Sequence, residues 1–129
     1  MSRPNIYQQV TFLYTNDLER SVNFYSEIMG LEMVLDQVYC KIFQVSRGGF
    51  LGVCATGQVS EIHDDVIFTF VTDQVDEWHS YLVNRNVQIE KVPNHNKKFN
   101  IYQMFLRDPN GYLLEIQEFL SPDWPSIIS

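Results

Sequence analysis

The fold is decided by a stretch of sequence that occurs twice, as VTFLYTND at residues 10–17 and as VIFTFVTD at residues 66–73. Both copies alternate with a period of two and are rich in β-branched and aromatic residues, which predicts a strand in each. The offset from the first copy to the second is 56 residues. The side chains expected on the matching face are Val10, Phe12 and Tyr14 in the first copy and Val66, Phe68 and Phe70 in the second.

A helix is expected after each strand. Asp17 and Asp73 are placed to cap the two helices. Gly30 and Asn86 tolerate the left-handed backbone that ends a helix. Further strand patterns follow in both halves, the later ones at an offset of 62, over residues 32–35, 40–45 and 50–53 and over residues 88–92, 102–107 and 112–115. Each half therefore has the order strand, helix, strand, strand, strand, which indicates an internal repeat.

Neither half could bury its helix and its sheet alone, so the two halves are expected to share one α+β architecture. We expect a single domain over residues 1–129 with eight strands in one curved mixed sheet, helices outside and a cleft within. Its expected parts are a first βαβββ module at about 8–55, a connector at 56–64, a second module at about 65–118 and a tail at 119–129.

The composition is that of an ordinary globular protein, with 45% hydrophobic and 19% charged residues among 129. A net charge of -7 disfavours nucleic acid and anionic membranes as partners. No apolar run approaches the ~18 residues of a membrane span, and the first residues lack a secretory signal, so a cytoplasmic location is expected. Cys40 and Cys54 are accordingly interpreted as reduced core thiols rather than as a disulfide or redox pair.

Two motifs carry a resemblance to a known family. The first is NDLERSVNFY at residues 16–25, followed by Met29-Gly30-Leu31, and the second is DPNGYLLE at residues 108–115. With the duplicated module, they resemble the vicinal oxygen chelate superfamily, which includes glyoxalases, bleomycin-resistance proteins and extradiol dioxygenases. The likeness covers roughly residues 8–118 and is specific for the fold rather than for the reaction, because this fold hosts several chemistries.

The resemblance implies where a divalent metal would be held. Enzymes of the family commonly take a His from the first strand and a Glu from the last strand of each module. Carried over position by position, the ligand positions are Val10, Val53, Val66 and Glu115. Valine has no donor atom, whereas a transition metal needs three or four donors from protein. No cofactor is therefore expected, and a metal stays open only in a nonstandard arrangement, for instance if a one-residue slip brings Gln9 to the ligand position.

Without a metal, the cleft is expected to bind a small organic molecule through apolar and aromatic side chains. Glu115 is the catalytic candidate, a general base with a raised pKa. It is alternatively a hydrogen-bond acceptor for the ligand, or a structural partner of Tyr14 or Tyr102. The loop before the seventh strand, with Lys97 and Lys98, is a second polar candidate. The expected ligand-binding residues are Val10, Phe12, Tyr14, Val53, Val66, Phe68, Phe70, Lys98, Asn100 and Tyr102.

Several functions stay open. The first is a metal-free binding protein of the bleomycin-resistance type, whose acidity suits a cationic ligand. The second is a glyoxalase-like, metal-dependent lyase or isomerase that uses Glu115, and the third is a metal-independent enzyme that uses Glu115 with the Lys97/Lys98 loop. An extradiol dioxygenase is disfavoured, because its His-His-Glu triad lacks two members. The resemblance also implies a homodimer. Trp124 and the pair Ile127-Ile128 in the tail are expected to dock on the body or on a second subunit, although Ile127 and Ile128 lie outside the residues that the structure describes.

Overall fold

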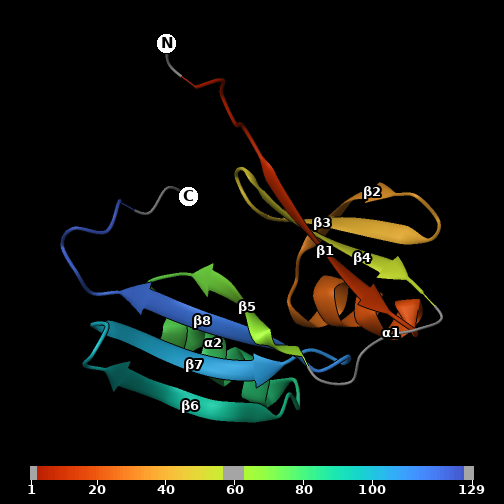
Figure 1. Cartoon of the computed structure of the whole chain (residues 1–129). Helices are drawn as coiled ribbons and strands as arrows, with labels where there is room; N and C mark the ends of the chain where they lie inside the picture. The colour runs from red at the N-terminus through yellow and green to blue at the C-terminus, as the bar shows by residue number, and fades with distance from the viewer. Residues whose placement is uncertain (1–2, 57–62, 127–129) are drawn as a thin grey trace. The chain divides into compact units, whose positions relative to one another are not determined.

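The computed structural model describes residues 3–56 and 63–126, which fall into two compact units (Figure 1). The first unit contains β1 (Gln9–Thr15), α1 (Leu18–Asn23), β2 (Glu32–Asp36), β3 (Cys40–Ser46) and β4 (Gly49–Ala55). The second contains β5 (His63–Val71), α2 (Val75–Asn84), β6 (Ile89–Asn96), β7 (Ile101–Arg107) and β8 (Tyr112–Phe119). This element order confirms the α+β class and the two-module arrangement. No helix of the described ranges is long and apolar enough to cross a membrane.

Each unit has its own four-stranded mixed sheet. The strand orders are β1-β4-β3-β2 and β5-β8-β7-β6. The pairs β1–β4 and β5–β8 are parallel, and the other pairs are antiparallel. The described strands therefore form two sheets of four rather than the single eight-stranded sheet expected from the sequence, because each strand pairs only within its own module. β5 also begins inside the predicted connector, at His63.

The repeat runs through the first strands at an offset of 57 residues rather than 56, since α1 begins at Leu18 and α2 at Val75. The hydroxyl of Thr15 accepts a hydrogen bond from the Asp17 N–H, and that of Thr72 accepts one from the Gln74 N–H, both at 3.0 Å. Asp17 caps α1 as predicted, by accepting from the Arg20 N–H at 3.1 Å. The prediction for Asp73 is wrong by one residue, because Gln74 occupies the cap position of α2.

The two helices begin 57 residues apart but end 56 residues apart, and a π-helical turn in the first unit accounts for the difference. After α1 the chain continues as a π-helical turn over Phe24–Ile28, where the Met29 N–H donates to the Phe24 carbonyl, five residues back, at 2.8 Å. Such a turn holds one residue more than an α-helical turn. The helical segments therefore end 56 residues apart, at Gly30 (φ 73°) and Asn86 (φ 61°), both in the predicted left-handed conformation.

In each unit, the helix lies against one face of the sheet, which we call the covered face (Figure 1). The opposite face, which has no helix of its own unit against it, is called the open face. In the first unit the covered face carries Leu13, Phe43, Leu51 and Val53, each at most 2% exposed. The Tyr25 ring lies 6.2 Å from that of Phe43, centroid to centroid. In the second unit the covered face carries Met104, Leu106, Leu114 and Ile116, also at most 1% exposed, and α2 adds Val75 and Leu82.

The corrected offset decides which side chains of β5 reach the open face, because a shift of one residue turns every side chain of a strand over. Phe68 and Phe70 lie on the covered face with Leu114 and Ile116, whereas Val66 lies in the irregular stretch of the β5–β8 pairing between His63 and Ile67. The Phe68 ring packs edge-on against Tyr112, with centroids 5.9 Å apart. The expectation that Phe68 and Phe70 share a face with Glu115 is therefore wrong. The open face of β5 carries Ile67, Thr69 and Val71 instead.

Cys40 and Cys54 are joined by a disulfide, so the interpretation as reduced thiols is wrong. The two residues lie directly opposite each other on β3 and β4, with Cα atoms 4.1 Å apart. Their pairing depends on the register of this hairpin, which brings together residues that are 14 positions apart in the sequence.

Candidate functional site

A group of four polar side chains lies on the open face of the second sheet, away from α2, and three of the four are buried. Glu115 and Gln117 lie on β8, Thr69 lies opposite Glu115 on β5, and Gln103 lies opposite Gln117 on β7. Glu115 is 8% exposed, Gln117 5% and Gln103 4%. Burial of polar groups costs free energy unless their hydrogen bonds are met, so this concentration marks a candidate binding site. We call these four residues the polar site.

The carboxyl group of Glu115 is held by one neighbour of the polar site. The Thr69 hydroxyl donates to Glu115 Oε1 at 2.8 Å. Burial raises the pKa of Glu115 above the ordinary value of 4.5, and the hydrogen bond from Thr69 offsets part of that rise. A carboxyl group with a raised pKa exchanges its proton closer to neutral pH, as a general acid or base requires. Within the second unit, the hydrogen-bond partner of Glu115 is thus Thr69 and not Tyr102, whose hydroxyl donates to Asp76.

The two glutamines of the polar site differ in how their oxygens are satisfied. Gln103 Oε1 accepts a hydrogen bond from Asn96 Nδ2 at 3.1 Å. Gln117 Oε1 is buried and accepts no hydrogen bond from the described part of the chain. Leaving a buried acceptor unmet costs about 1–3 kcal/mol. The polar site therefore holds an oxygen that a donor from outside would stabilise.

Apolar side chains surround the polar site on the same face. Ile67 and Val71 on β5 are 48% and 40% exposed, and Phe105 lies opposite Glu115 on β7. At the far end of β8, Trp124 from the tail stacks on Phe119, with ring centroids 3.6 Å apart and planes 14° from parallel. Trp124 therefore docks on the body of its own chain, one of the two placements expected.

The corresponding place in the first unit carries no polar side chain. Gly52 lies opposite Phe12 there, as Glu115 lies opposite Thr69, so the repeat offset in the last strands is 63 rather than 62. A Cβ atom on Gly52 would lie 2.5 Å from the Phe12 ring, which shows that the ring rests on this glycine. Val53, the predicted counterpart of Glu115, is 0% exposed on the covered face, so its predicted place in the cleft is wrong.

These registers also test whether a divalent metal fits. With the offsets corrected, the four ligand positions of the family become Val10, Gly52, Ile67 and Glu115. Glu115 alone among them has a donor atom in its side chain. Over residues 3–56 and 63–126, no three His, Cys, Asp or Glu residues gather in a way that could hold a metal ion. A transition metal takes three or four donor atoms from protein, and these positions supply a single carboxylate. The residues present therefore do not fit a divalent metal.

The remaining predicted residues lie in two places. Val10, Phe12 and Tyr14 lie on the open face of the first sheet and are 40%, 47% and 53% exposed. The structure does not bring Lys98, Asn100 and Tyr102 to the polar site. Lys98 and Asn100 belong to the turn between β6 and β7, where the Lys98 N–H donates to Asn96 Oδ1 at 3.1 Å. Tyr102 points to the covered face, and its hydroxyl donates to Asp76 on α2 at 2.6 Å.

Thr69, Gln103 and Gln117 were not predicted from the sequence. A usable signal was present, since Glu115 and Gln117 are polar at alternate positions of a strand whose first three residues are apolar or aromatic.

The DPNG motif acts through backbone geometry. Asp108 is 5% exposed, and its Oδ1 accepts from the N–H groups of Asn110 and Tyr112, both at 2.9 Å. Gly111 has a φ of 87°, a conformation that favours glycine. The motif therefore sets the turn from which β8 starts, and through that register it places Glu115 on the open face.

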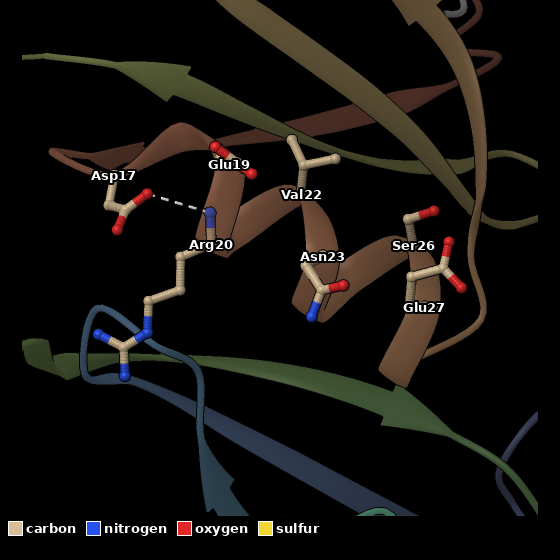
Figure 2. A pocket seen from close by; sticks show the side chains of 7 residues that line it. All are labelled: Asp17, Glu19, Arg20, Val22, Asn23, Ser26 and Glu27. Carbon is tan, nitrogen blue, oxygen red and sulfur yellow. Dashed lines mark hydrogen bonds between the residues drawn. The ribbon is translucent and has the colours of Figure 1, made fainter.

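Apart from the polar site, a hollow runs along α1 (Figure 2). The Asp17 carboxylate is engaged with the backbone N–H of Arg20, and the Arg20 guanidinium extends away from it (Figure 2). None of the lining side chains is buried, so this hollow lacks the desolvated groups that mark the polar site. The lining residues are Asp17, Glu19, Arg20, Val22, Asn23, Ser26 and Glu27.

Comparison with known proteins supports the resemblance seen in the sequence. YraH of Bacillus subtilis strain 168, an uncharacterised protein, is 26% identical over 121 residues, covering 84% of this chain and 94% of YraH. The solved structure of lactoylglutathione lyase from Agrobacterium tumefaciens is 24% identical, with a TM-score of 0.74 over 90% of this chain and 96% of the lyase. That of a glyoxalase/bleomycin resistance protein/dioxygenase from Nocardioides is 19% identical, with a TM-score of 0.76 over 100% of this chain and 92% of that protein. The two structures show a shared fold.

The family model that describes the Glyoxalase/Bleomycin resistance protein/Dioxygenase superfamily matches residues 7–116, most of the chain. The protein therefore belongs to this superfamily, the vicinal oxygen chelate superfamily.

Proposed function

We propose that the protein binds a small organic molecule at the polar site and does so without a resident divalent metal. The observation that carries this proposal is the burial of Glu115 and Gln117 side by side, with the amide oxygen of Gln117 unmet. The donor set supports it as well, because Val10, Gly52 and Ile67 occupy the other positions at which the family's enzymes hold their metal.

The surroundings of the polar site suit a ligand with a polar group and an apolar body. The polar group would hydrogen-bond to Glu115 and Gln117, while the body would lie against Phe105 and the exposed branched side chains Ile67 and Val71. The exposed row Val10, Phe12 and Tyr14 of the first sheet stays a proposed contact for a ring-bearing ligand. A net charge of -7 favours neutral or cationic ligands over anions, as in a bleomycin-resistance-like protein.

Native mass spectrometry of the protein as purified tests this proposal, because one spectrum reports the oligomer mass, any retained compound and any metal. We expect less than about a tenth of an equivalent of metal. A screen of organic fragments by protein NMR should shift the backbone signals of β8, and Glu115→Ala should abolish these shifts. A full equivalent of Ni²⁺, Zn²⁺ or Fe²⁺ held by the protein, or fragments that shift only signals far from β8, would contradict the proposal.

The second candidate is a glyoxalase-like lyase or isomerase, favoured by the raised pKa of Glu115 and the fold shared with a lactoylglutathione lyase. Glu115 would take a proton from a carbon beside a carbonyl group, as a general base. Added Ni²⁺, Zn²⁺ or Fe²⁺ should then produce turnover of lactoylglutathione that Glu115→Gln removes. Turnover without metal would favour the third, metal-independent enzyme, although the structure does not bring the Lys97/Lys98 turn to Glu115.

The homodimer and the cytoplasmic location stay predictions. The same native spectrum reports the dimer mass. The disulfide between Cys40 and Cys54 counts against a reducing compartment, and thiol counting on protein trapped with an alkylating agent at cell lysis distinguishes the two cases.

A further inference from the structure

Gln117 is the polar side chain of the site whose hydrogen bonding is incomplete. It is 5% exposed, and its Oε1 receives no hydrogen bond from the described residues. Gln103, opposite on β7, has its own oxygen occupied by Asn96. An acceptor that is buried and unmet is stabilised by a ligand that brings a hydrogen-bond donor.

The position of Glu115 limits which donor would serve. Glu115 and Gln117 are successive residues on one face of β8, and such residues lie about 7 Å apart along a strand. A single atom between their side chains could reach both through hydrogen bonds of about 3 Å. That atom must carry two hydrogens or more if it is to donate to both residues. An amine or primary amide nitrogen meets this requirement, whereas a hydroxyl group has one hydrogen and a carboxylate has none.

Resting on the proposed function, we infer that Gln117 is a specificity-determining residue for ligands that carry an amino or primary amide group. The nitrogen donates one hydrogen to Gln117 Oε1 and another to a carboxyl oxygen of Glu115. The rest of the ligand is neutral or cationic and apolar, since Ile67 and Phe105 adjoin the polar site. Carboxylate ligands are excluded, because they bring no donor and face the charge of Glu115.

Four probes with the same ring separate the donor from the apolar body: benzylamine, benzamide, benzyl alcohol and benzoate. Each is titrated into the full-length protein, and the side-chain amide of Gln117 and the backbone signals of β8 are followed by NMR. We expect benzylamine and benzamide to bind about tenfold more tightly than benzyl alcohol, the scale of one hydrogen bond. Benzoate should bind more weakly still. Gln117→Met, which keeps the length of the side chain without the acceptor, should remove the preference.

Gln37→Met is the matched control, since Gln37 is an exposed glutamine in the first unit, and the preference should survive it. Equal binding of the amine, the amide and the alcohol to wild type would overturn the inference and leave the proposed function standing. A preference that persists in Gln117→Met would do the same. If no probe shifts the signals of β8, both the inference and the proposed function fail for this class of ligand. The comparison among probes on wild type decides the matter even if Gln117→Met does not fold.

Discussion

The burial of Glu115 has a measurable consequence for stability. Its side chain is 8% exposed, and this burial raises its pKa above 4.5 in the folded protein. Below pH 4.5 the carboxyl group is neutral in the folded and the unfolded chain, so ionisation imposes no cost. As the pH rises, the unfolded chain gains the freedom to ionise while the folded chain resists it. The free energy of unfolding therefore falls with rising pH until the pH passes the folded pKa.

Glu115→Gln removes this dependence, because a glutamine is neutral at every pH and can still accept from Thr69. We expect the variant and wild type to have similar free energies of unfolding near pH 4, and the variant to become the more stable as the pH rises. The difference grows by up to about 1.4 kcal/mol per pH unit within the window that opens at the unfolded pKa and closes at the folded one. Thr69→Val should widen the window upward, since Thr69 donates the hydrogen bond that lowers the pKa of Glu115.

Urea denaturation at half-unit steps from pH 4 to pH 8 measures the difference, and a carbon-13 NMR titration of the Glu115 carboxyl reports its ionisation directly. Glu32→Gln is the control, since it removes a carboxylate of the same kind from an exposed position on β2. A difference between Glu115→Gln and wild type that stays constant across this range, or that shrinks as the pH rises, would refute the assignment of Glu115 as a buried carboxyl group without a compensating cation.

Three further variants test contacts inside each of the two units. Replacing both Cys40 and Cys54 by serine removes a disulfide between residues 14 apart and should lower the free energy of unfolding by about 3 kcal/mol, because the unfolded chain gains entropy. Chemical reduction of wild type should lower the urea midpoint by the same amount as the double substitution. Gly52→Ala forces the half-exposed Phe12 ring away from the sheet and should lower the urea midpoint, whereas an unchanged midpoint would show that the ring moves freely. Leu114→Ala should cost about 2–5 kcal/mol, and a loss below about 1 kcal/mol would contradict its place beneath α2.

The candidate site shows how far a sequence pattern reaches. Glu115 was predicted from the resemblance of the motif DPNGYLLE to the family's signature. The structure shows that this motif also sets the turn from which β8 starts. The other residues of the polar site were missed, since only the pairing of β5, β8 and β7 places Thr69 opposite Glu115 and Gln103 opposite Gln117. Phe68 and Phe70 were assigned to the wrong face for a related reason. The extra residue of a π-helical turn near Phe24 shifts the repeat by one, and no local pattern marks such an insertion.

The sequence by itself determined the α+β class, the two modules, the order of their elements and the left-handed ends at Gly30 and Asn86, because periodicity and turn chemistry act over a few residues. The tertiary structure alone decided the register between strands. That register divides the eight strands into two four-stranded sheets and places Cys40 opposite Cys54. It also places the Phe12 ring against Gly52, and Gln117 beside Glu115 on a face where both are buried. Its physical basis is long-range hydrogen bonding, in which a shift of one residue exchanges the covered face of a strand for the open one.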